Sequence, residues 1–129
     1  MTTRVLMVDD EIDAQELFRQ NFRREIRKGV YAFDFALSGE DALQILHHGT
    51  PPEVLVLLSD INMPGMSGVE LLEEVQKTWP DIRVFMITAY GDAATQTQVE
   101  EMGASQFFTK PVDFARLKID LAVATGASA

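Results

Sequence analysis

The chain has 129 residues and no cysteine, which excludes disulfide bonds and thiol chemistry. No apolar run approaches the ~20 residues that a membrane-spanning helix needs. The amino-terminal stretch MTTRVLMVDD reaches an acidic pair too early for a secretory signal. These absences are typical of a cytoplasmic protein. The length predicts one domain over residues 1–129, with residues 124–129 as a flexible tail or the start of a linker.

Positive charge is also scarce, because 11 Lys and Arg residues stand against 20 Asp and Glu residues, for a net charge of −9. Such a domain is expected to repel nucleic acid and acidic membranes. One basic stretch is an exception. It contains Arg19, Arg23, Arg24, Arg27 and Lys28. Two interpretations stay open: cations that favour the carboxyl end of a helix, or a docking patch for a partner.

Five segments are predicted to be β-strands. In residues 31–37, Tyr31, Phe33 and Phe35 alternate with other residues, and this period of two indicates a strand with one wet face, often an edge strand. The other four are short apolar runs, which are typical of strands buried on both faces. They are Val5–Val8, Val54–Leu58, Ile82–Ile87 and Phe107–Phe108.

Helical patterns separate these strands. Ser38-Gly-Glu-Asp41 and Ser67-Gly-Val-Glu70 both predict helix starts, each with a capping serine and an acid three residues later. Pro51 and Pro80 close the preceding helices, and Gly49 is a predicted cap. The apolar stripes are Ala14, Phe18, Phe22 and Ile26 with Leu17 beside them, then Leu43 and Leu46, then Leu71, Leu72, Val75 and Trp79. Strict alternation predicts an α/β fold, a parallel sheet with helices on both faces.

Polar residues follow four of the five predicted strands. In a doubly wound sheet, sites lie at the carboxyl ends of the strands, so these residues are expected to converge. Only the predicted edge strand, at residues 31–37, ends without such a group. The four strand ends are Asp9-Asp10-Glu11, Ser59-Asp60, Thr88-Ala89 and Thr109-Lys110-Pro111.

Such a group of residues suits phosphoryl chemistry. Crowded carboxylates repel each other and favour a cation, and oxygen-rich sites suit Mg²⁺. A lysine and a hydroxyl beside one carboxylate then make a site that can receive a phosphoryl group. Taken singly, Asp9 and Asp60 are equally well explained as caps of a helix or turn, and Thr88 and Lys110 as ordinary loop residues. The prediction of a phosphoryl-accepting site therefore rests on the four polar strand ends taken together.

With these motifs the sequence resembles the receiver domains of bacterial two-component response regulators, of the chemotaxis-regulator type. The resemblance covers residues 4 to about 123. It rests on VDDE after the first strand, DINMPGMSG after the third, TA after the fourth and KP after the fifth. The resemblance implies a flavodoxin-like, doubly wound sheet of five parallel strands in the order 2-1-3-4-5.

The resemblance also implies roles for the site residues. Asp60 is the phosphoacceptor, and Asp10, Asp60 and the backbone carbonyl of Asn62 bind Mg²⁺, or Mn²⁺ in its place. Asp9 acts through metal-bound water. Lys110 pairs with the acceptor and then with the phosphoryl group, and Thr88 bonds a phosphoryl oxygen and moves its loop. Phe107 occupies the position of an aromatic switch, and Pro64, Gly65 and Gly68 shape the loop after the acceptor.

Two departures from the family pattern bear on kinetics. Phe107 lacks the hydroxyl of the tyrosine that many members carry there. Tyr90 is a bulky neighbour of the acceptor, and Ala89 and Asn62 are the other positions expected to modulate the site. From these residues we predict slow self-dephosphorylation.

The signal is expected to leave through the face formed by the helix over residues 93–102, the strand at 107–108 and the last helix, which starts at Val112. The first of these helices has few large apolar residues, a feature of a movable element. The last has a core stripe, with Phe114, Leu117 and Leu121, and a second apolar stripe of Ala115, Ile119, Ala122 and Val123. A partner, an attached output domain or a second copy is expected on this face.

The leading hypothesis is a phosphorylatable switch that takes its group from a histidine kinase or a histidine phosphotransfer protein, and that is not a turnover enzyme. A receiver-like interaction module that works without phosphate is the alternative, and the complete set of polar strand ends argues against it. A magnesium-dependent phosphohydrolase would need an acid where Asn62 stands. A flavin-binding protein would need a phosphate loop where Asp9, Asp10 and Glu11 repel phosphate.

Overall fold

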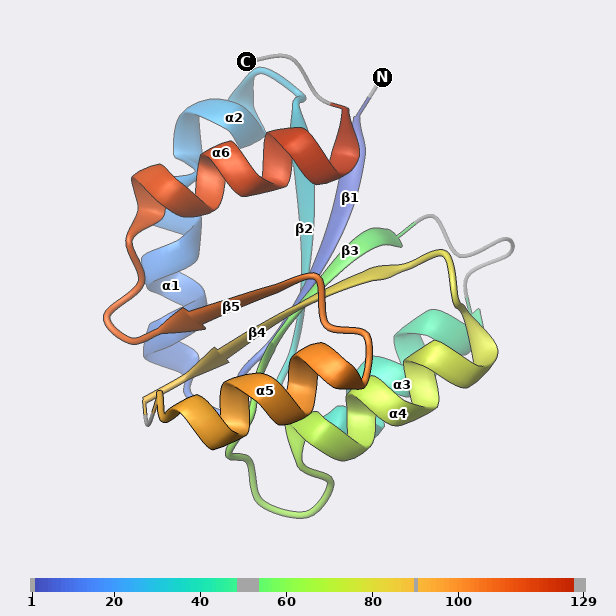
Figure 1. Cartoon of the computed structure of the whole chain (residues 1–129). Coiled ribbons are helices and arrows are strands. Elements are labelled where there is room, and N and C mark those ends of the chain that lie inside the picture. The colour runs from blue at the N-terminus through green and yellow to red at the C-terminus, as the bar shows by residue number, and fades with distance from the viewer. Residues whose placement is uncertain (1, 49–53, 90, 127–129) are drawn as a thin grey trace.

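The computed structural model describes residues 2–48, 54–89 and 91–126, except the side chain of Leu55. Five strands form one parallel sheet in the order β2-β1-β3-β4-β5, as predicted, with β2 at an edge. Figure 1 shows the sheet with helices on both of its faces. The strands are β1 (Thr3–Val8), β2 (Tyr31–Ala36), β3 (Val54–Asp60), β4 (Arg83–Thr88) and β5 (Gln106–Thr109). The helices are α1 (Ile12–Asn21), α2 (Arg23–Arg27), α3 (Gly39–His48), α4 (Gly68–Thr78), α5 (Ala93–Glu101) and α6 (Phe114–Thr125).

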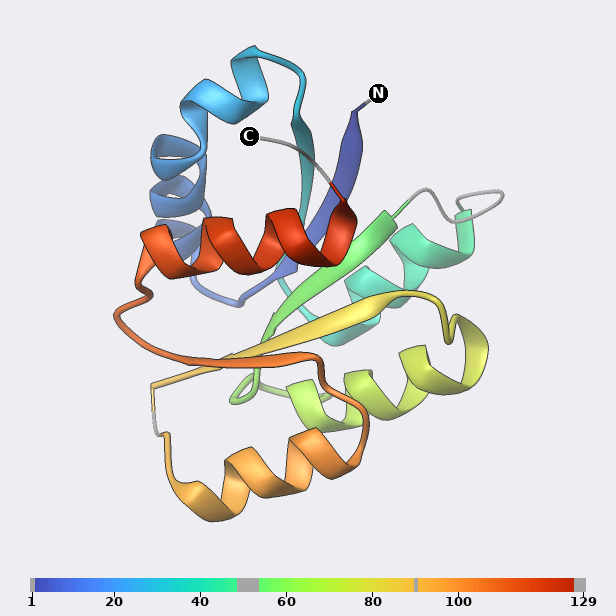
Figure 2. The same cartoon turned by 45° about the horizontal axis from the view of Figure 1, so that its top comes forward.

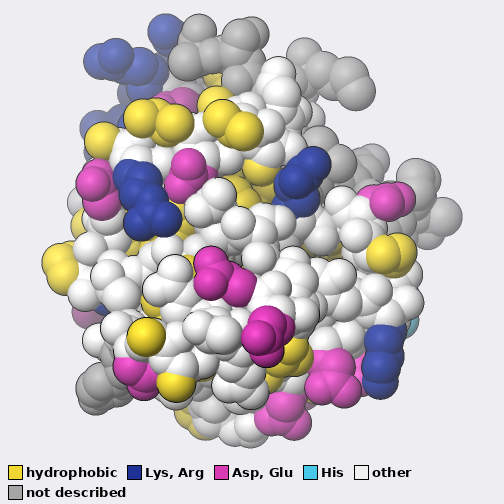
Figure 3. Space-filling view, viewed as in Figure 1, with side chains coloured by type: hydrophobic (Ala, Val, Ile, Leu, Met, Phe, Trp, Pro, Cys, Tyr) yellow, Lys and Arg dark blue, Asp and Glu magenta, His cyan; other side chains and the backbone are white. Residues whose placement is uncertain are grey.

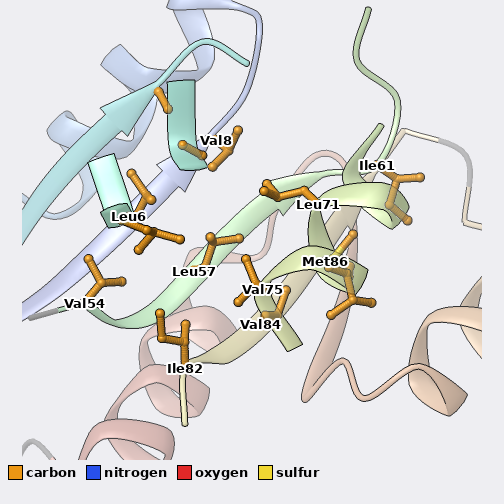
Figure 4. Packing of buried hydrophobic residues seen from close by; sticks show 14 of the residues in the cluster. Leu6, Val8, Val54, Leu57, Ile61, Leu71, Val75, Ile82, Val84 and Met86 are labelled. Atoms are coloured by element: carbon orange, nitrogen blue, oxygen red, sulfur yellow. The ribbon is translucent and has the colours of Figure 1, made fainter. Parts of the chain in front are cut away.

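Side chains of successive strand residues enter two different cores. Leu6 and Leu57 point toward α3, α4 and α5, whereas Val5 and Leu58 point toward α1 and α6. Figure 4 shows the first core, in which strand residues lie against α4. Figure 2 shows α6 and α5 on opposite sides of the sheet. Continuous apolar runs were therefore correctly read as strands buried on both faces.

The predicted helix starts are confirmed. Ser67 and Glu70 form a capping box at the start of α4, and the Asp41 backbone N–H donates to Ser38 Oγ at 3.0 Å. The last helix begins at Phe114 and not at Val112, because Asp113 caps it through the Arg116 backbone N–H. Gly49 and Pro51 lie outside the described residues.

The first predicted helix differs from the expectation, since it is divided at Phe22 into α1 and α2. Phe18 and Phe22 are buried as expected, but Ile26 is 38% exposed and Leu17 is 48% exposed. A spacing of four residues advances about 40° beyond a full helical turn each time, so a stripe of this period drifts away from the core face. The amphipathic pattern therefore found the helix but not its end.

Across the described part of the chain, none of the helices is long and apolar enough to cross a membrane.

Candidate functional site

The polar strand ends meet at the carboxyl edge of the sheet, as the sequence predicts. The parallel register places Asp60, the last residue of β3, beside Ile87 of β4. The backbone N–H of Lys110 donates to the Thr88 carbonyl at 2.8 Å, which ties the end of β5 to the end of β4. The Asp9 N–H donates to the Ala36 carbonyl at 3.1 Å, which fixes the end of β1 against β2. These backbone hydrogen bonds thus bring the polar strand ends together.

Lys110 links two buried carboxylates. Its Nζ donates to Asp9 Oδ2 at 2.9 Å and to Asp60 Oδ2 at 3.1 Å. The side chains of Asp9 and Asp60 are 2% and 7% exposed, and that of Lys110 is 26% exposed. Burial by itself lowers the pKa of Lys110, but its hydrogen bonds to Asp9 and Asp60 outweigh burial and raise it. The ammonium is therefore fully charged at neutral pH.

The surroundings of Asp60 disfavour its charged form. Burial raises the pKa of the Asp60 carboxyl above its ordinary value, and the hydrogen bond from Lys110 offsets only part of that effect. The other oxygen, Oδ1, accepts a hydrogen bond from the Asn62 backbone N–H at 3.2 Å. A further cation near Asp60 would therefore be stabilising.

Asp9, Asp10 and Asp60 form a cluster with the chemistry of a magnesium site. One carboxylate oxygen of each lies within 4.8 Å of the others. Asp9 and Asp60 are buried, whereas Asp10 is exposed, so the cluster opens to solvent on one side. Hard oxygen donors with an open side suit Mg²⁺, which retains several waters. Glu11 contributes only its backbone N–H, which donates to Asp9 Oδ1 at 2.9 Å.

Thr88 lies on the other side of the cluster and is 1% exposed. Its Oγ1 accepts a hydrogen bond from Asn62 Nδ2 at 3.3 Å. Sequence reasoning gave Asn62 only a backbone carbonyl and a modulating role, so this side-chain contact was missed. No sequence signal could have found it, because it joins residues 26 positions apart.

The remaining predicted residues fall around this centre. Phe107 is 7% exposed and packs in the core beneath α5. Ala89 is exposed at the end of β4. Tyr90 lies outside the described residues.

The glycines of the loop after β3 have distinct reasons to be glycine. A Cβ on Gly68 would lie 2.2 Å from the Asp60 carbonyl oxygen and 2.7 Å from Ile61 Cα. Gly65 has a φ of +73°, which favours glycine. The start of α4 can therefore pack directly against the backbone of Asp60.

We expect Gly68→Ala to lower the free energy of unfolding by about 1–3 kcal/mol, because the new methyl group meets rigid backbone. Gly39→Ala is the matched control, since the three atoms nearest to its Cβ would all belong to the flexible Met66 side chain. Urea denaturation of both variants measures the difference. Equal stability of the two variants would contradict the close approach at Gly68.

An apolar pocket of about 240 Å³ adjoins the site. It lies between the first half of α1 and the segment after β5, and sequence reasoning did not find it. Ile12 and Leu17 on α1 are 65% and 48% exposed. Its lining includes Asp9, Ala14, Leu17, Phe18, Lys110, Pro111 and Val112.

Comparison with known proteins agrees with this fold. The profile of the response regulator receiver domain matches residues 5–122. Sporulation initiation phosphotransferase F of Bacillus subtilis is 33% identical over 118 residues, covering 92% of this chain and 90% of that protein. Response regulator protein PilR of Pseudomonas aeruginosa is 38% identical over 117 residues, covering 89% of this chain but only 24% of that protein. The chain therefore belongs to the response regulator receiver domain family of two-component systems.

A solved structure is similar throughout. Response regulator protein TrrA of Thermotoga maritima, in complex with Mg(2+)-BeF, is 30% identical with a TM-score of 0.80. The match covers 96% of this chain and 99% of that one. The predicted fold and strand order are thus confirmed.

Proposed function

We propose that Asp60 is a phosphoacceptor that takes a phosphoryl group from a phosphohistidine of a histidine kinase or a histidine phosphotransfer protein. The observation that carries the proposal is the Lys110 ammonium, which bonds Asp9 and Asp60 together at the open carboxylate cluster. A lysine held beside one buried carboxylate is placed to neutralise the charge of a transferring phosphoryl group.

In the proposed reaction, an Asp60 carboxylate oxygen forms a bond to phosphorus while the phosphorus–nitrogen bond of the donor breaks. The bonding electrons stay with the histidine nitrogen of the donor. Lys110 and the Thr88 hydroxyl then donate hydrogen bonds to phosphoryl oxygens, and Thr88 can do so while its Oγ1 still accepts from the Asn62 amide. The chain is modified once per event and is not a turnover enzyme.

Mg²⁺ would neutralise phosphoryl oxygens beside the acceptor when bound. Asp10, Asp60 and the Asn62 backbone carbonyl are the proposed ligands, with Asp9 acting through water. The cluster of three carboxylates supports this assignment, as does the magnesium in the TrrA complex. Mn²⁺ offers similar coordination chemistry.

The donor is proposed to dock at the apolar pocket beside the cluster. Leu17 lines the pocket and is 48% exposed, and Ile12 on the same helix is 65% exposed, so a partner that covered both would gain apolar burial. The pocket lining reaches Asp9 and Lys110, so a donor seated on it would approach the acceptor.

The output surface is proposed to be the face of α5, β5 and α6. Only Val99 of α5 is buried, so packing holds this helix weakly. Ile119 and Val123 of α6 are 65% and 79% exposed, and they extend an apolar stripe that a partner, an output domain or a second copy could cover. Thr88, the last residue of β4, and Phe107, the second residue of β5, are the proposed switch residues.

Intact mass after incubation with acetyl phosphate and Mg²⁺ tests the proposal. We expect a gain of one phosphoryl group, absent in Asp60→Asn and absent when a chelator replaces Mg²⁺. A gain that persists in Asp60→Asn would place the acceptor elsewhere. No gain with either acetyl phosphate or a phosphorylated phosphotransfer protein would favour the module that works without phosphate.

A further inference from the structure

A second pocket, of about 400 Å³, lies on the flank of the molecule formed by α1, α2 and the edge strand β2. This flank is at the opposite edge of the sheet from β5, and α6 is the element of the proposed output face that packs against it, with Lys118 paired to Glu25 of α2 at 2.9 Å. We call it the flank groove. Its lining residues are Arg19, Arg23, Ile26, Arg27, Phe33 and Phe35.

The floor of the flank groove is apolar and incompletely buried. The rings of Phe33 and Phe35 stack with their centroids 6.0 Å apart, and both residues are partly exposed. Ile26 is 38% exposed, because the stripe of the first helix turns away from the core there. A large apolar side chain bound against these three residues would bury apolar surface that the domain itself leaves exposed to solvent.

The rim of the flank groove is basic and partly prearranged. The Arg19 guanidinium carbon lies 4.4 Å from the centre of the Phe35 ring, a cation–π contact that holds it at the groove. Arg19 has a loose ion pair with Glu16 at 3.5 Å. Within the described residues, no carboxylate lies within ion-pair distance of Arg23 or Arg27, and both are exposed.

This positive charge is local. Figure 3 shows Lys and Arg side chains gathered at the end of the molecule where Figure 1 draws α2. The whole chain carries a net charge of −9. A long polyanion such as nucleic acid, or an anionic membrane surface, would meet that overall repulsion, whereas a short acidic segment can contact the arginines alone.

We propose that the flank groove binds an acidic segment of a protein partner, with a large apolar side chain on the floor and carboxylates on the rim. Guanidinium groups bind carboxylates in a bidentate manner, and arginines beside aromatic side chains are enriched in protein interfaces. None of the residues that line the groove lies on β5, α5 or α6, so an occupant need not cover the proposed output face. The groove thus selects a partner, whereas the proposed switch face signals to one.

Selection of a displayed random heptapeptide library against the whole chain tests this proposal. We expect the enriched peptides to combine several Asp or Glu residues with a Phe, Trp, Tyr or Leu. In fluorescence anisotropy, Arg23→Glu combined with Arg27→Glu is expected to weaken binding of the synthesised peptides about tenfold or more. Ile26→Ser tests the floor separately and is expected to weaken binding about threefold to tenfold.

Arg24→Glu is the matched control, because Arg24 is exposed on the same helix but does not line the groove. We expect it to change the affinity by less than about twofold. The proposal would be overturned by no enrichment of acidic peptides, by equal weakening by the control, or by tighter binding of a single-stranded oligonucleotide or of vesicles containing anionic phospholipid. Self-association that the groove substitutions abolish would make a second copy the occupant, and would overturn it too.

Discussion

Lys110→Met is expected to lower the free energy of unfolding by about 3–5 kcal/mol at neutral pH, because it removes the cation from a buried pair of carboxylates. Asp9 and Asp60 lie 2.9 Å and 3.1 Å from Nζ, and both are almost fully buried. Methionine fills a similar volume, so the loss comes from charge and not from packing. Urea denaturation in a chelator measures it.

The same substitution is expected to slow phosphoryl uptake from acetyl phosphate at least about hundredfold, since a fixed charge at the transferring group is lost. Rates are compared where both proteins are folded, which separates this effect from instability. Mg²⁺ is expected to stabilise Lys110→Met more than the wild type, because it supplies the missing charge.

Lys77→Met is the control for removing a lysine. Lys77 is 66% exposed and lies 3.7 Å from Glu73 in an exposed ion pair. Such pairs contribute little, so we expect a change below about 1 kcal/mol and no effect on uptake. A Lys110→Met protein as stable as Lys77→Met would contradict the importance of the buried bridge.

Asp60→Asn is expected to raise the melting temperature at pH 7 in a chelator, by roughly 3–5 °C for a stabilisation on the order of 1 kcal/mol. Burial raises the pKa of Asp60 above its ordinary value of 3.8. The folded state therefore binds a proton more tightly than the unfolded chain does. The stability that this proton provides is present at low pH and is lost as pH rises through the raised pKa. The wild type loses this stability as the pH rises through the raised pKa, whereas the amide has no such loss.

The difference in melting temperature is expected to shrink as the pH falls from 7 through the raised pKa toward 3.8. Saturating Mg²⁺ is expected to reverse the order, because a ligand at about 100 times its Kd stabilises by about 2.7 kcal/mol and the amide is the poorer ligand. Asp81→Asn is the control, since Asp81 is an exposed acid just before the amino end of β4, whereas the site lies at the carboxyl ends of the strands. A wild type more stable than Asp60→Asn at pH 7 in the chelator would mean that attraction to Lys110 outweighs burial.

Lys110→Met and Asp60→Asn test two opposing contributions to the free energy of unfolding: the attraction of Lys110 for the carboxylates and the cost of burying the Asp60 carboxylate. The carboxylates suit the site for a cation and for phosphoryl transfer, but burying the Asp60 carboxylate opposes folding, and Lys110 offsets only part of that cost. Combining Lys110→Met with Asp60→Asn should therefore cost less than Lys110→Met alone, and the double-mutant cycle gives the coupling directly.

The strands, the parallel sheet and the polar strand ends could be predicted from sequence because each depends on local patterns, whereas the order of the strands was implied by the resemblance to the receiver family. Runs such as Val54–Leu58 are apolar throughout, which suits only a strand covered on both faces. The Ser67 and Glu70 capping box is likewise local, with both partners within one turn. Once a parallel sheet is granted, its geometry brings the carboxyl ends of the strands together.

The contacts that define the site were decided by the tertiary structure. Lys110 bonds a residue 101 positions away and another 50 positions away, and no local pattern encodes such distances. The Asn62–Thr88 bond, the exposure of Ile26 after the break at Phe22, and the flank groove also depend on how helices rotate against the sheet. The sequence by itself determined which residues end the strands, because the spacing of apolar residues can be read from neighbouring positions. Only packing determined which of their atoms touch, because side-chain directions follow from the whole fold.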